Sequence, residues 1–343
     1  MPNMSSPSAT VPSPVIVSDG VDFCSSVFPE HAFPPPDGVL DDYRRLCRRG
    51  YAVMARSRVA ITGLARNIGQ VLPVSIRRVE DLGRLFADYR VVVFENDSVD
   101  DTKLLLRHWS ATNRRVTVIC EDLSDPVNPA TRCLARAERM ADYRRRSQDQ
   151  VLDTCRRYDA TILVDLDILG GWSLDGIAHT FGHTGWDFVG SNGLVFRRQG
   201  LAMNVPRQYD TWALRFDRDL APVPTVDGAG FVPGRGEPLV PVTSCFGGLG
   251  IYTMEAYAAG RYEADDIEHA TFHRRLIAEG HHRLFLNPSQ IVIYGRRHRR
   301  SDGIAQLLIG GWASLTGRRP PRALFGRSDS PTDVVAAANR AAA

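Results

Sequence analysis

The chain has 343 residues, of which 43% are hydrophobic and 24% charged, with a formal net charge of +3. This length and apolar content are enough for one large core, and the nearly neutral charge argues against nucleic acid as the partner of the whole surface. Of the 42 basic residues only Lys103 is a lysine, a bias that points to the coding genome more than to function.

Cysteine usage and hydropathy predict the compartment. The 6 cysteines are scattered, without a C-x-x-C pair, which predicts reduced thiols rather than disulfides or structural zinc. The first residues lack a basic stretch followed by an apolar core, and no apolar run approaches the ~18 residues of a membrane span. We therefore expect a cytoplasmic protein, with contact to the inner face of a membrane as an option for its tail.

The elements expected in chain order alternate between helix and strand. Residues 1–40 are rich in Pro and Ser and predict a flexible arm. Helices are then expected over 41–54, 73–89, 101–109 and 132–158, and strands over 59–62, 91–94, 116–119 and 160–164. This alternation predicts one α/β domain over residues 41–298, with a mostly parallel sheet that binds ligands beyond the carboxyl ends of its strands.

Polar residues follow the first two expected strands. Gly63, Arg66 and Asn67 come after the first strand, and the acceptor-rich run 95–102 comes after the second. In this run, Ser98 or Asp100 could cap the helix that follows. Alternatively, its acidic and amide groups could hold a base or ribose. Both interpretations can hold for different residues.

The helix expected over 132–158 is rich in arginine. We expect most of these arginines on a solvated face. Arg132, Arg136 and Arg139 are spaced so that their guanidinium groups lie along one side. One of them could reach a diphosphate.

The strand expected over 160–164 ends in two carboxylates, Asp165 and Asp167, ahead of a Gly-Gly turn. A hard divalent cation takes carboxylate ligands together with substrate phosphates, so this pair predicts a metal–nucleotide site. The tripeptide alone is weak, because Asp217-Arg218-Asp219 repeats it without a preceding apolar strand.

Three later segments add candidates. The Pro-, Gly- and Asp-rich run 217–240 predicts a loop that could cover an acceptor. Gly247 and Gly248 allow close backbone approach to a ligand or to a neighbouring strand. The acidic and imidazole groups of 265–273 offer a general base, a metal ligand, or only the solvated start of a helix. No lysine-bearing phosphate loop and no dinucleotide fingerprint accompany them.

The tail over residues 299–343 has basic residues on both sides of an apolar patch. This pattern suits a helix that lies on an anionic membrane. We favour the simpler interpretation, in which the apolar patch packs on the core and the basic run folds over a diphosphate.

Taken together, these motifs resemble a nucleotide-sugar glycosyltransferase of the GT-A fold over about residues 58–298. The nearest likeness is to the capsule-associated α-1,3-mannosyltransferase family of fungi and its bacterial relatives. It rests on the run from Phe94 to Thr102, the helix with Arg136 and Arg144, Asp165-Leu166-Asp167, Cys245-Phe246-Gly247-Gly248, and Glu268-His269.

The resemblance implies a Mn²⁺ or Mg²⁺ ion at Asp167, with Asp165 on the ion or on the donor ribose. It also implies a nucleoside diphosphate sugar, mannose being one option, and transfer to a hydroxyl of a glycan, a lipid-linked saccharide or another acceptor. If transfer inverts the anomeric configuration, Asp266 or Glu268 serves as base; if it retains the configuration, His269 completes the metal site. The residues expected to bind the donor are Gly63, Arg66, Asn67, Glu95, Asn96, Asp97, Arg136, Arg139, Asp165, Gly247 and Gly248.

Two other function classes share this pattern. A metal-dependent nucleotidyltransferase would also have an acidic strand end, but we would expect a Gly-rich basic loop after the first strand, of which Gly63 to Arg66 is a thin version. A non-catalytic nucleotide or carbohydrate binder would tolerate loss of Asp165 and Asp167.

Overall fold

The computed structural model describes residues 27–128, 133–199, 203–216 and 232–297. The predicted tail, the comparison tripeptide at 217–219, Arg132 and the first 26 residues of the predicted arm lie outside the described residues.

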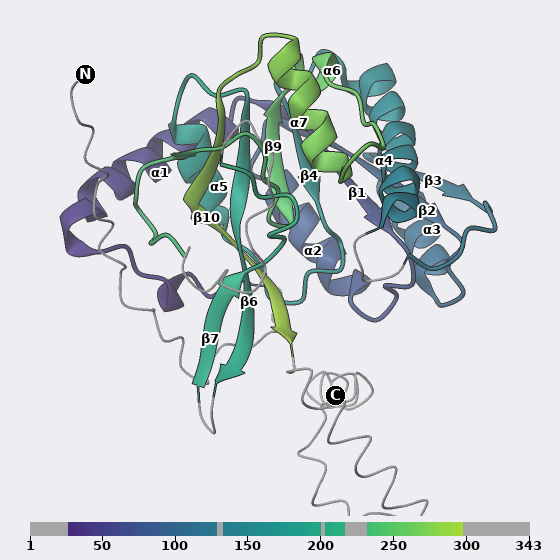
Figure 1. Cartoon of the computed structure of the whole chain (residues 1–343), viewed down its shortest axis with the longest axis horizontal. Helices are drawn as coiled ribbons and strands as arrows, with labels where there is room; N and C mark the ends of the chain where they lie inside the picture. Colours follow the sequence, from purple (N-terminus) through teal and green to yellow (C-terminus); the bar gives the residue numbers. More distant parts are fainter. Residues whose placement is uncertain (1–26, 129–132, 200–202, 217–231, 298–343) are drawn as a thin grey trace, which may run out of the picture.

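The described residues form a ten-stranded sheet in the order β3-β2-β1-β4-β9-β6-β10-β5, with β7 beside β6 and β8 beside β10. Figure 1 shows it with helices on both faces. The strands are β1 (Arg58–Ala65), β2 (Asp88–Asn96), β3 (Val116–Glu121), β4 (Ala160–Val164), β5 (Gly171–Trp172), β6 (Phe188–Gln199), β7 (Met203–Gln208), β8 (Val240–Pro241), β9 (Leu249–Thr253) and β10 (Leu284–Arg297).

Strand direction divides the sheet. Strands β3, β2, β1 and β4 are mutually parallel, as are β6 and β10, whereas β9 runs antiparallel to both β4 and β6. The predicted α/β fold is thus confirmed, with β9 as an antiparallel insertion. Because β9 is antiparallel to β4, its first residues meet the carboxyl end of β4, where the Asp165 N–H donates to the Gly248 carbonyl oxygen at 2.9 Å.

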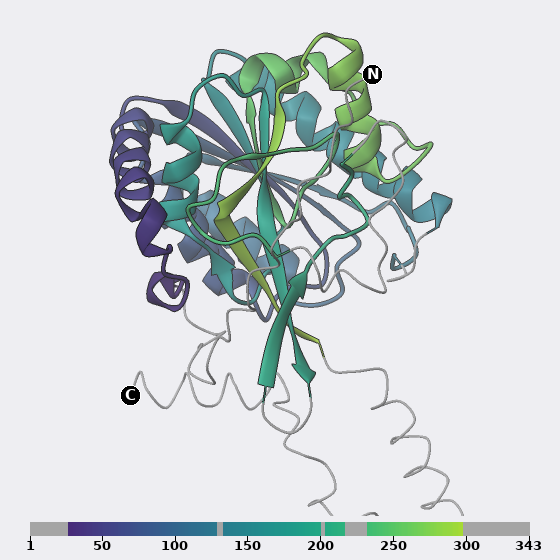
Figure 2. The same cartoon turned by 60° about the vertical axis from the view of Figure 1, so that its left-hand side comes forward.

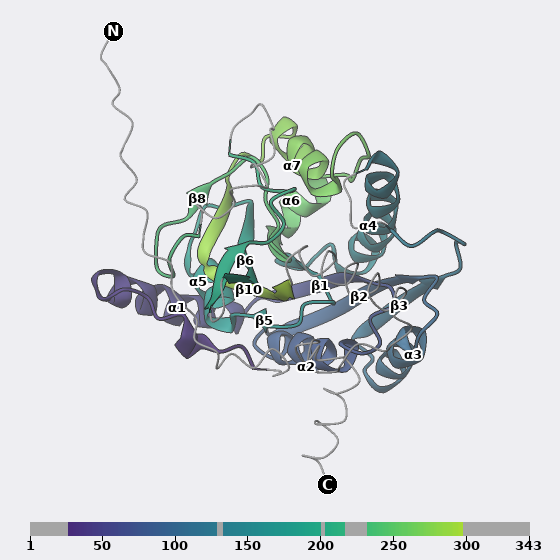
Figure 3. The ribbon, with the colours of Figure 1, turned by 60° about the horizontal axis from the view of Figure 1, so that its bottom comes forward.

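Helices cover both faces of the sheet. Figure 3 shows α2 and α3 on one face and α4, α6 and α7 on the other, while α1 and α5 pack together near β10. The alternation of buried residues along the strands explains this: Ile61 and Ile162 face one core, and Ala60 and Leu163 face the other. The helices are α1 (Leu40–Met54), α2 (Leu72–Gly83), α3 (Thr102–Thr112), α4 (Leu134–Cys155), α5 (Leu174–Gly182), α6 (Met254–Ala259) and α7 (Glu268–Ala278).

Most predicted boundaries differ from the structure by a few residues, and two differ by more. Helix α2 ends at Gly83 rather than at residue 89, and the apolar residues that continue its spacing, such as Phe86, pack in the turn before β2. Residues 27–39, predicted as arm, pack on the fold as two short 3-10 turns, Glu30–Ala32 and Asp37–Val39, with Phe28 and Phe33 buried. Proline prevents a long helix there but does not prevent burial of aromatic rings.

Two further features concern the exterior and the thiols. Strands β6 and β7 extend past the body of the sheet as a projecting pair (Figure 2).

In the described part of the chain no helix has the length and hydropathy needed to cross a membrane. The five cysteines described there carry free thiols, as predicted for them.

Candidate functional site

The turn after β4 presents the two predicted carboxylates, and helix α2 holds its backbone. Ser75 Oγ donates to the Leu166 carbonyl at 2.6 Å. Arg78 is buried and donates to the carbonyl oxygens of Ile168 and Leu169, both at 2.8 Å. The shape of the turn is therefore fixed through its carbonyls, which leaves the Asp165 and Asp167 side chains for other contacts.

Two tyrosines approach these carboxylates from distant parts of the chain. The Tyr209 hydroxyl lies 3.5 Å from Asp165 Oδ2, and the Tyr294 hydroxyl lies 3.4 Å from Asp167 Oδ2. The two rings stack on each other with centroids 4.1 Å apart. The stacked pair therefore places one long, weak hydroxyl contact on each carboxylate.

A buried arginine on α4 joins Asp165 to α7. Arg144 is 5% exposed. Its Nη2 lies 3.6 Å from Asp165 Oδ1, and its Nε donates to Glu268 Oε1 at 3.2 Å. Its guanidinium lies 5.2 Å from the centre of the Phe246 ring. One cation thus connects the strand-end carboxylate to a buried acid on another element.

Asp210 makes the site more acidic. It follows β7 with a φ of 58°, and the N–H of Gly247 donates to its carboxylate. Burial, and then the negative charge of Glu268, raise its pKa to about 7. Burial and the neighbouring Asp167 likewise raise the pKa of Asp165, although the cation of Arg144 opposes them. Four carboxylates around one buried guanidinium are electrostatically suited to a divalent cation.

The glycine turn supports this arrangement by close backbone packing. Gly247 and Gly248 have φ of 66° and 89°, a region that favours glycine. A Cβ on Gly247 would lie 2.2 Å from the Ser191 carbonyl oxygen. Of the two predicted reasons for these glycines, close approach to a neighbouring strand is confirmed for Gly247, since Ser191 belongs to β6.

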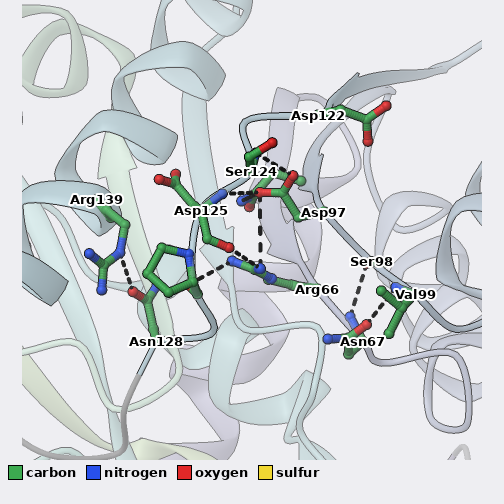
Figure 4. A network of polar contacts seen from close by, with 12 residues as sticks. Arg66, Asn67, Asp97, Ser98, Val99, Asp122, Ser124, Asp125, Asn128 and Arg139 are labelled. Carbon is green, nitrogen blue, oxygen red and sulfur yellow. Dashed lines mark hydrogen bonds and ion pairs between the residues drawn. The ribbon is translucent and has the colours of Figure 1, made fainter.

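The loops after β1, β2 and β3 form one network at the same edge of the sheet (Figure 4). Asp97 accepts from the N–H groups of Ser124 and Asp125 at 2.9 and 3.1 Å and from Asn96 Nδ2 at 2.9 Å. Burial acts to raise the pKa of Asp97, but these hydrogen bonds outweigh it and the pKa is lowered. Asp97 is therefore an ionised link between two loops.

The loop after β1 belongs to the same network. Arg66 donates to the carbonyls of Asp125 and Pro126 at 2.6 and 3.1 Å. Asn67 accepts from the Val99 N–H at 2.9 Å. Gly63 lies within β1, where a Cβ would be 2.7 Å from the Val164 carbonyl oxygen. Arg66 and Asn67 therefore join the linked loops, whereas Gly63, which was predicted after the first strand, lies within β1 and outside this network.

The predicted capping role in the run 95–102 is confirmed for Asp100, whose Oδ1 accepts from the Thr102 N–H at 3.0 Å. Ser98 instead accepts from the Asn67 N–H at 3.0 Å and thus links two loops. Glu95 is fully buried and accepts from the Ser98 N–H at 2.8 Å. The run both caps a helix and builds the network.

The two predicted arginines of α4 lie in different places. The Arg136 guanidinium lies 5.3 Å from the centre of the Trp212 ring. Desolvation by the surrounding protein raises the pKa of Asp167, and the charge of Arg136 opposes that rise. Arg139 donates to Asn128 Oδ1 at 2.7 Å and thus belongs to the network of Figure 4. Arg136 is therefore the one of the two whose charge acts on the acidic pair.

The acids and imidazole at the start of α7 are all engaged. Asp266 Oδ2 lies 3.5 Å from the buried Arg215, and Glu268 pairs with Arg144. His269 is buried, stacks on Phe246 with centroids 3.9 Å apart, and has its Nε2 3.7 Å from Glu268 Oε1. Neither ring nitrogen of His269 has a hydrogen-bond partner within the described residues. These contacts join His269 to Phe246 and Glu268 rather than to Asp165 or Asp167.

No three His, Cys, Asp or Glu side chains of the described residues are grouped as a complete metal site. Two surface hollows, one near Asp88 and the other near Asp159, lie at the amino ends of β2 and β4, away from these carboxylates. The candidate site is thus defined by its polar groups rather than by a closed cavity. Any ion held at Asp165 and Asp167 needs further ligand atoms from the molecule that binds with it.

Sequence reasoning missed Arg144 as a site residue, although a signal was present. The buried stripe of α4 contains Ala137, Ala141, Gln148 and Val151, and Arg144 falls on it at the same alternating spacing of three and four residues. An arginine on the buried stripe of an amphipathic helix needs an internal partner. Tyr209, Asp210 and Tyr294 had no comparable local signal.

No family model and no curated protein sequence matches the chain, whereas solved structures do. One is GalNAc-T7 with UDP, GalNAc and Mn²⁺, at 13% identity and a TM-score of 0.45, covering 71% of this chain and 45% of that one. Another is the mannosyltransferase PcManGT from Pyrobaculum calidifontis with GDP-Man and Mn²⁺, at 15% identity and a TM-score of 0.41, covering 83% and 74%.

A third is glucosyl-3-phosphoglycerate synthase from Mycobacterium tuberculosis with Mn²⁺, UDP and phosphoglyceric acid. It matches at 15% identity with a TM-score of 0.39, covering 83% of this chain and 84% of that one. The chain thus spans less than half of GalNAc-T7 and most of the other two.

Proposed function

We propose that this chain is a metal-dependent glycosyltransferase that moves a sugar from a nucleoside diphosphate sugar to a hydroxyl acceptor. The observation that carries the proposal is the pair Asp165 and Asp167 at the carboxyl end of β4, on a turn fixed by α2 and within an acidic cluster. Ligands of open α/β sheets bind at this edge.

The Asp165 and Asp167 carboxylates are suitable ligands for a hard divalent cation. Asp167 is exposed and Asp165 keeps 22% of its side chain exposed, so both can meet an ion from solvent. Asp165 and Asp167 would hold Mn²⁺ or Mg²⁺ together with diphosphate oxygens of the donor. When bound, the ion supplies positive charge for the diphosphate as it leaves.

The other proposed donor contacts follow from position. Arg136 would add a second positive charge near Asp167, because its charge already acts on that carboxylate. Its guanidinium is positioned over the Trp212 ring. The linked loops that carry Asn67, Asn96 and Asp97 would form the nucleoside side. In the transfer, the bond between the anomeric carbon and the diphosphate oxygen breaks and the acceptor oxygen bonds to that carbon.

The acceptor hydroxyl must also lose its proton. In an inverting transfer a carboxylate takes this proton. Of the two acids predicted for the role, the Asp266 side chain is 29% exposed and that of Glu268 only 7%. We therefore propose Asp266 as the base of an inverting transfer. In a retaining transfer no such base is required. The resemblance favours mannose as sugar and a glycan or lipid-linked acceptor.

Arg66 disfavours the nucleotidyltransferase alternative. That class would use a basic loop after the first strand to hold a triphosphate. Here Arg66 is occupied by the carbonyls of Asp125 and Pro126. This contact gives Arg66 the role of fixing a loop.

The test is thermal stability against UDP-, GDP-, CDP- and ADP-nucleotides with Mn²⁺ or with EDTA. A ligand at 100 times its Kd that binds only the folded chain adds about 2.7 kcal/mol. We expect one nucleoside diphosphate to stabilise the wild type only with Mn²⁺. Asp167→Asn should abolish this response, and Asp153→Asn, at an exposed position of α4, should keep it.

The same samples separate the function classes by product. Release of nucleoside diphosphate from a sugar donor, lost in Asp167→Asn, supports the proposal. Release of pyrophosphate from a nucleoside triphosphate and a sugar phosphate would support the nucleotidyltransferase instead. Metal-dependent binding with no turnover of any donor and acceptor would leave a binding protein.

A further inference from the structure

We propose that Arg144 is a positioning residue of this metal site: it fixes the orientation of Asp165, and Glu268 in turn fixes Arg144. The inference rests on the proposed function. It goes further by giving Glu268 a role behind the site, as the anchor of the arginine.

The geometry matches the fork of a guanidinium. Arg144 uses two different nitrogens for two different acids, Nη2 toward Asp165 at 3.6 Å and Nε toward Glu268 at 3.2 Å. The ring of Phe246, 5.2 Å away, restrains the plane of the group through a cation–π contact. A lysine has a single charged nitrogen and lacks this planar fork.

Asp165 is more exposed than the two residues behind it in this chain of contacts. The side chain of Asp165 is 22% exposed, that of Arg144 6% and that of Glu268 7%. Arg144 therefore connects a buried acid, Glu268, to Asp165, the more exposed of the two carboxylates that it contacts. A buried charge held on both sides moves little, so it can set the angle of the outer carboxylate.

Asp165 is held on both of its oxygens. Arg144 lies on Oδ1, and the Tyr209 hydroxyl lies on Oδ2 at 3.5 Å. If Arg144 served only to neutralise Glu268, the Nε contact alone would satisfy that need. The second contact gives Arg144 an effect on the predicted metal ligand, of the kind by which groups behind a ligand typically change metal affinity 10–100-fold.

The test is the Kd for Mn²⁺ in the presence of the nucleoside diphosphate that stabilises the wild type. It is measured from the electron paramagnetic resonance signal of free Mn²⁺, corrected for Mn²⁺ bound by the nucleotide alone, with circular dichroism to follow folding. Arg144→Met alone leaves Glu268 buried without its cation and can fail to fold. The decisive variant is therefore Arg144→Met combined with Glu268→Gln, which removes both charges. Arg146→Met, at an arginine of the same helix that pairs with Glu121 and Asp142, is the control.

We expect the double variant to fold like the wild type and to bind Mn²⁺ 10–100-fold more weakly. Arg144→Lys should also bind at least 10-fold more weakly, while Arg146→Met should match the wild type. A folded double variant with wild-type Mn²⁺ affinity overturns the positioning role, and so does full affinity in Arg144→Lys. If the wild type binds no Mn²⁺ with any of the nucleoside diphosphates tested, the proposed function fails and this inference fails with it.

Discussion

Arg78 Nη1 donates to the carbonyl oxygen of Ile168 at 2.8 Å, so a buried arginine of one helix determines the path of the turn that carries Asp165 and Asp167. The Nη2 of the same side chain donates to Leu169 at 2.8 Å. Helix α2 therefore shapes the turn that we propose to bind metal. It does so through the backbone carbonyls of the turn, and the Asp165 and Asp167 carboxylates take no part in these hydrogen bonds.

We expect Arg78→Met to lower the free energy of unfolding by about 2–4 kcal/mol, because carbonyls of the turn lose a charged donor. It should also abolish stabilisation by Mn²⁺ and nucleotide, since the two carboxylates lose their fixed spacing. Urea unfolding and the nucleotide stability assay measure the two effects. Arg84→Met, at the exposed end of α2, should change neither. Intact nucleotide binding in folded Arg78→Met would contradict this account of the turn.

Asp266→Asn tests the proposed base. If transfer inverts, we expect kcat to fall at least about 100-fold, as typical for loss of a general base, while donor affinity stays near that of the wild type. Asp265→Asn, which replaces the exposed neighbour paired with Arg274, is the matched control. The anomeric configuration of the product, read by NMR, decides whether a base is needed. An inverted product with full kcat in Asp266→Asn would remove Asp266 from the mechanism.

His273 predicts acid sensitivity of the fold. Its ring contacts the hydroxyls of Ser244 and Tyr252 at 2.9 and 2.8 Å, and burial lowers its pKa to about 3. The unfolded chain takes up this proton near pH 6.5, so between pH 6.5 and 3 the unfolded state binds more protons. The free energy of unfolding should therefore fall with decreasing pH, by at most about 1.4 kcal/mol per pH unit for this group.

The pH dependence can be assigned by substitution. Urea unfolding of His273→Gln between pH 4 and 8 should show a smaller slope than the wild type. His108→Gln, at an exposed position, should keep the wild-type slope. Equal slopes in all three chains would mean that His273 does not contribute.

Asp210 predicts the opposite slope. The carboxyl group loses its proton near pH 3.8 in the unfolded chain and near pH 7 in the fold, so between these values the folded state binds more protons. The contribution of Asp210 to the free energy of unfolding of the metal-free chain should therefore fall as pH rises from 4 to 7. Asp210→Asn, which tolerates the positive φ, should stabilise the chain in EDTA more at pH 8 than at pH 4. A gain that is equal at both pH values would contradict the shift.

Gly247→Ala tests the glycine turn. The new Cβ would lie 2.2 Å from the Ser191 carbonyl oxygen at a φ of 66°, so we expect a loss of about 2–4 kcal/mol in the free energy of unfolding. Gly38→Ala, where a Cβ would have no neighbour within 4 Å, should cost little. Equal stability of the two variants would show that the turn can relax.

The sequence predicts much of the fold and some residues of the candidate site. Strand and helix periodicity identifies β1 to β4 and their helices, because each element buries one face or stripe of its own residues. Asp165 and Asp167 are predictable because they directly follow an apolar strand. Arg144 needed the observation that it lies on the buried stripe of α4.

The rest depends on topology. Tyr209 and Tyr294 reach Asp165 and Asp167 only because the assembled sheet brings a residue just after β7 and a residue within β10 to the turn after β4. Tyr209 is 44 positions from Asp165, and Tyr294 is 127 positions from Asp167. No local sequence pattern encodes contacts over such separations. Likewise, proline content predicted a flexible arm that includes residues 27–39. Burial of Phe28 and Phe33 there depends on residues far along the chain, such as Phe196 and Ile293.

Strand β9 pairs with β4 on one side and β6 on the other, and this has a consequence for biosynthesis. Residues 58–164 contain the four mutually parallel strands β1 to β4, so we expect that half to begin assembly on the ribosome once it has emerged. Strand β6 has to wait about fifty residues more, until Leu249–Thr253 is made, before it can join. We expect the nascent chain to expose the open edge of β4 during that interval, when binding of a chaperone there would protect it from aggregation.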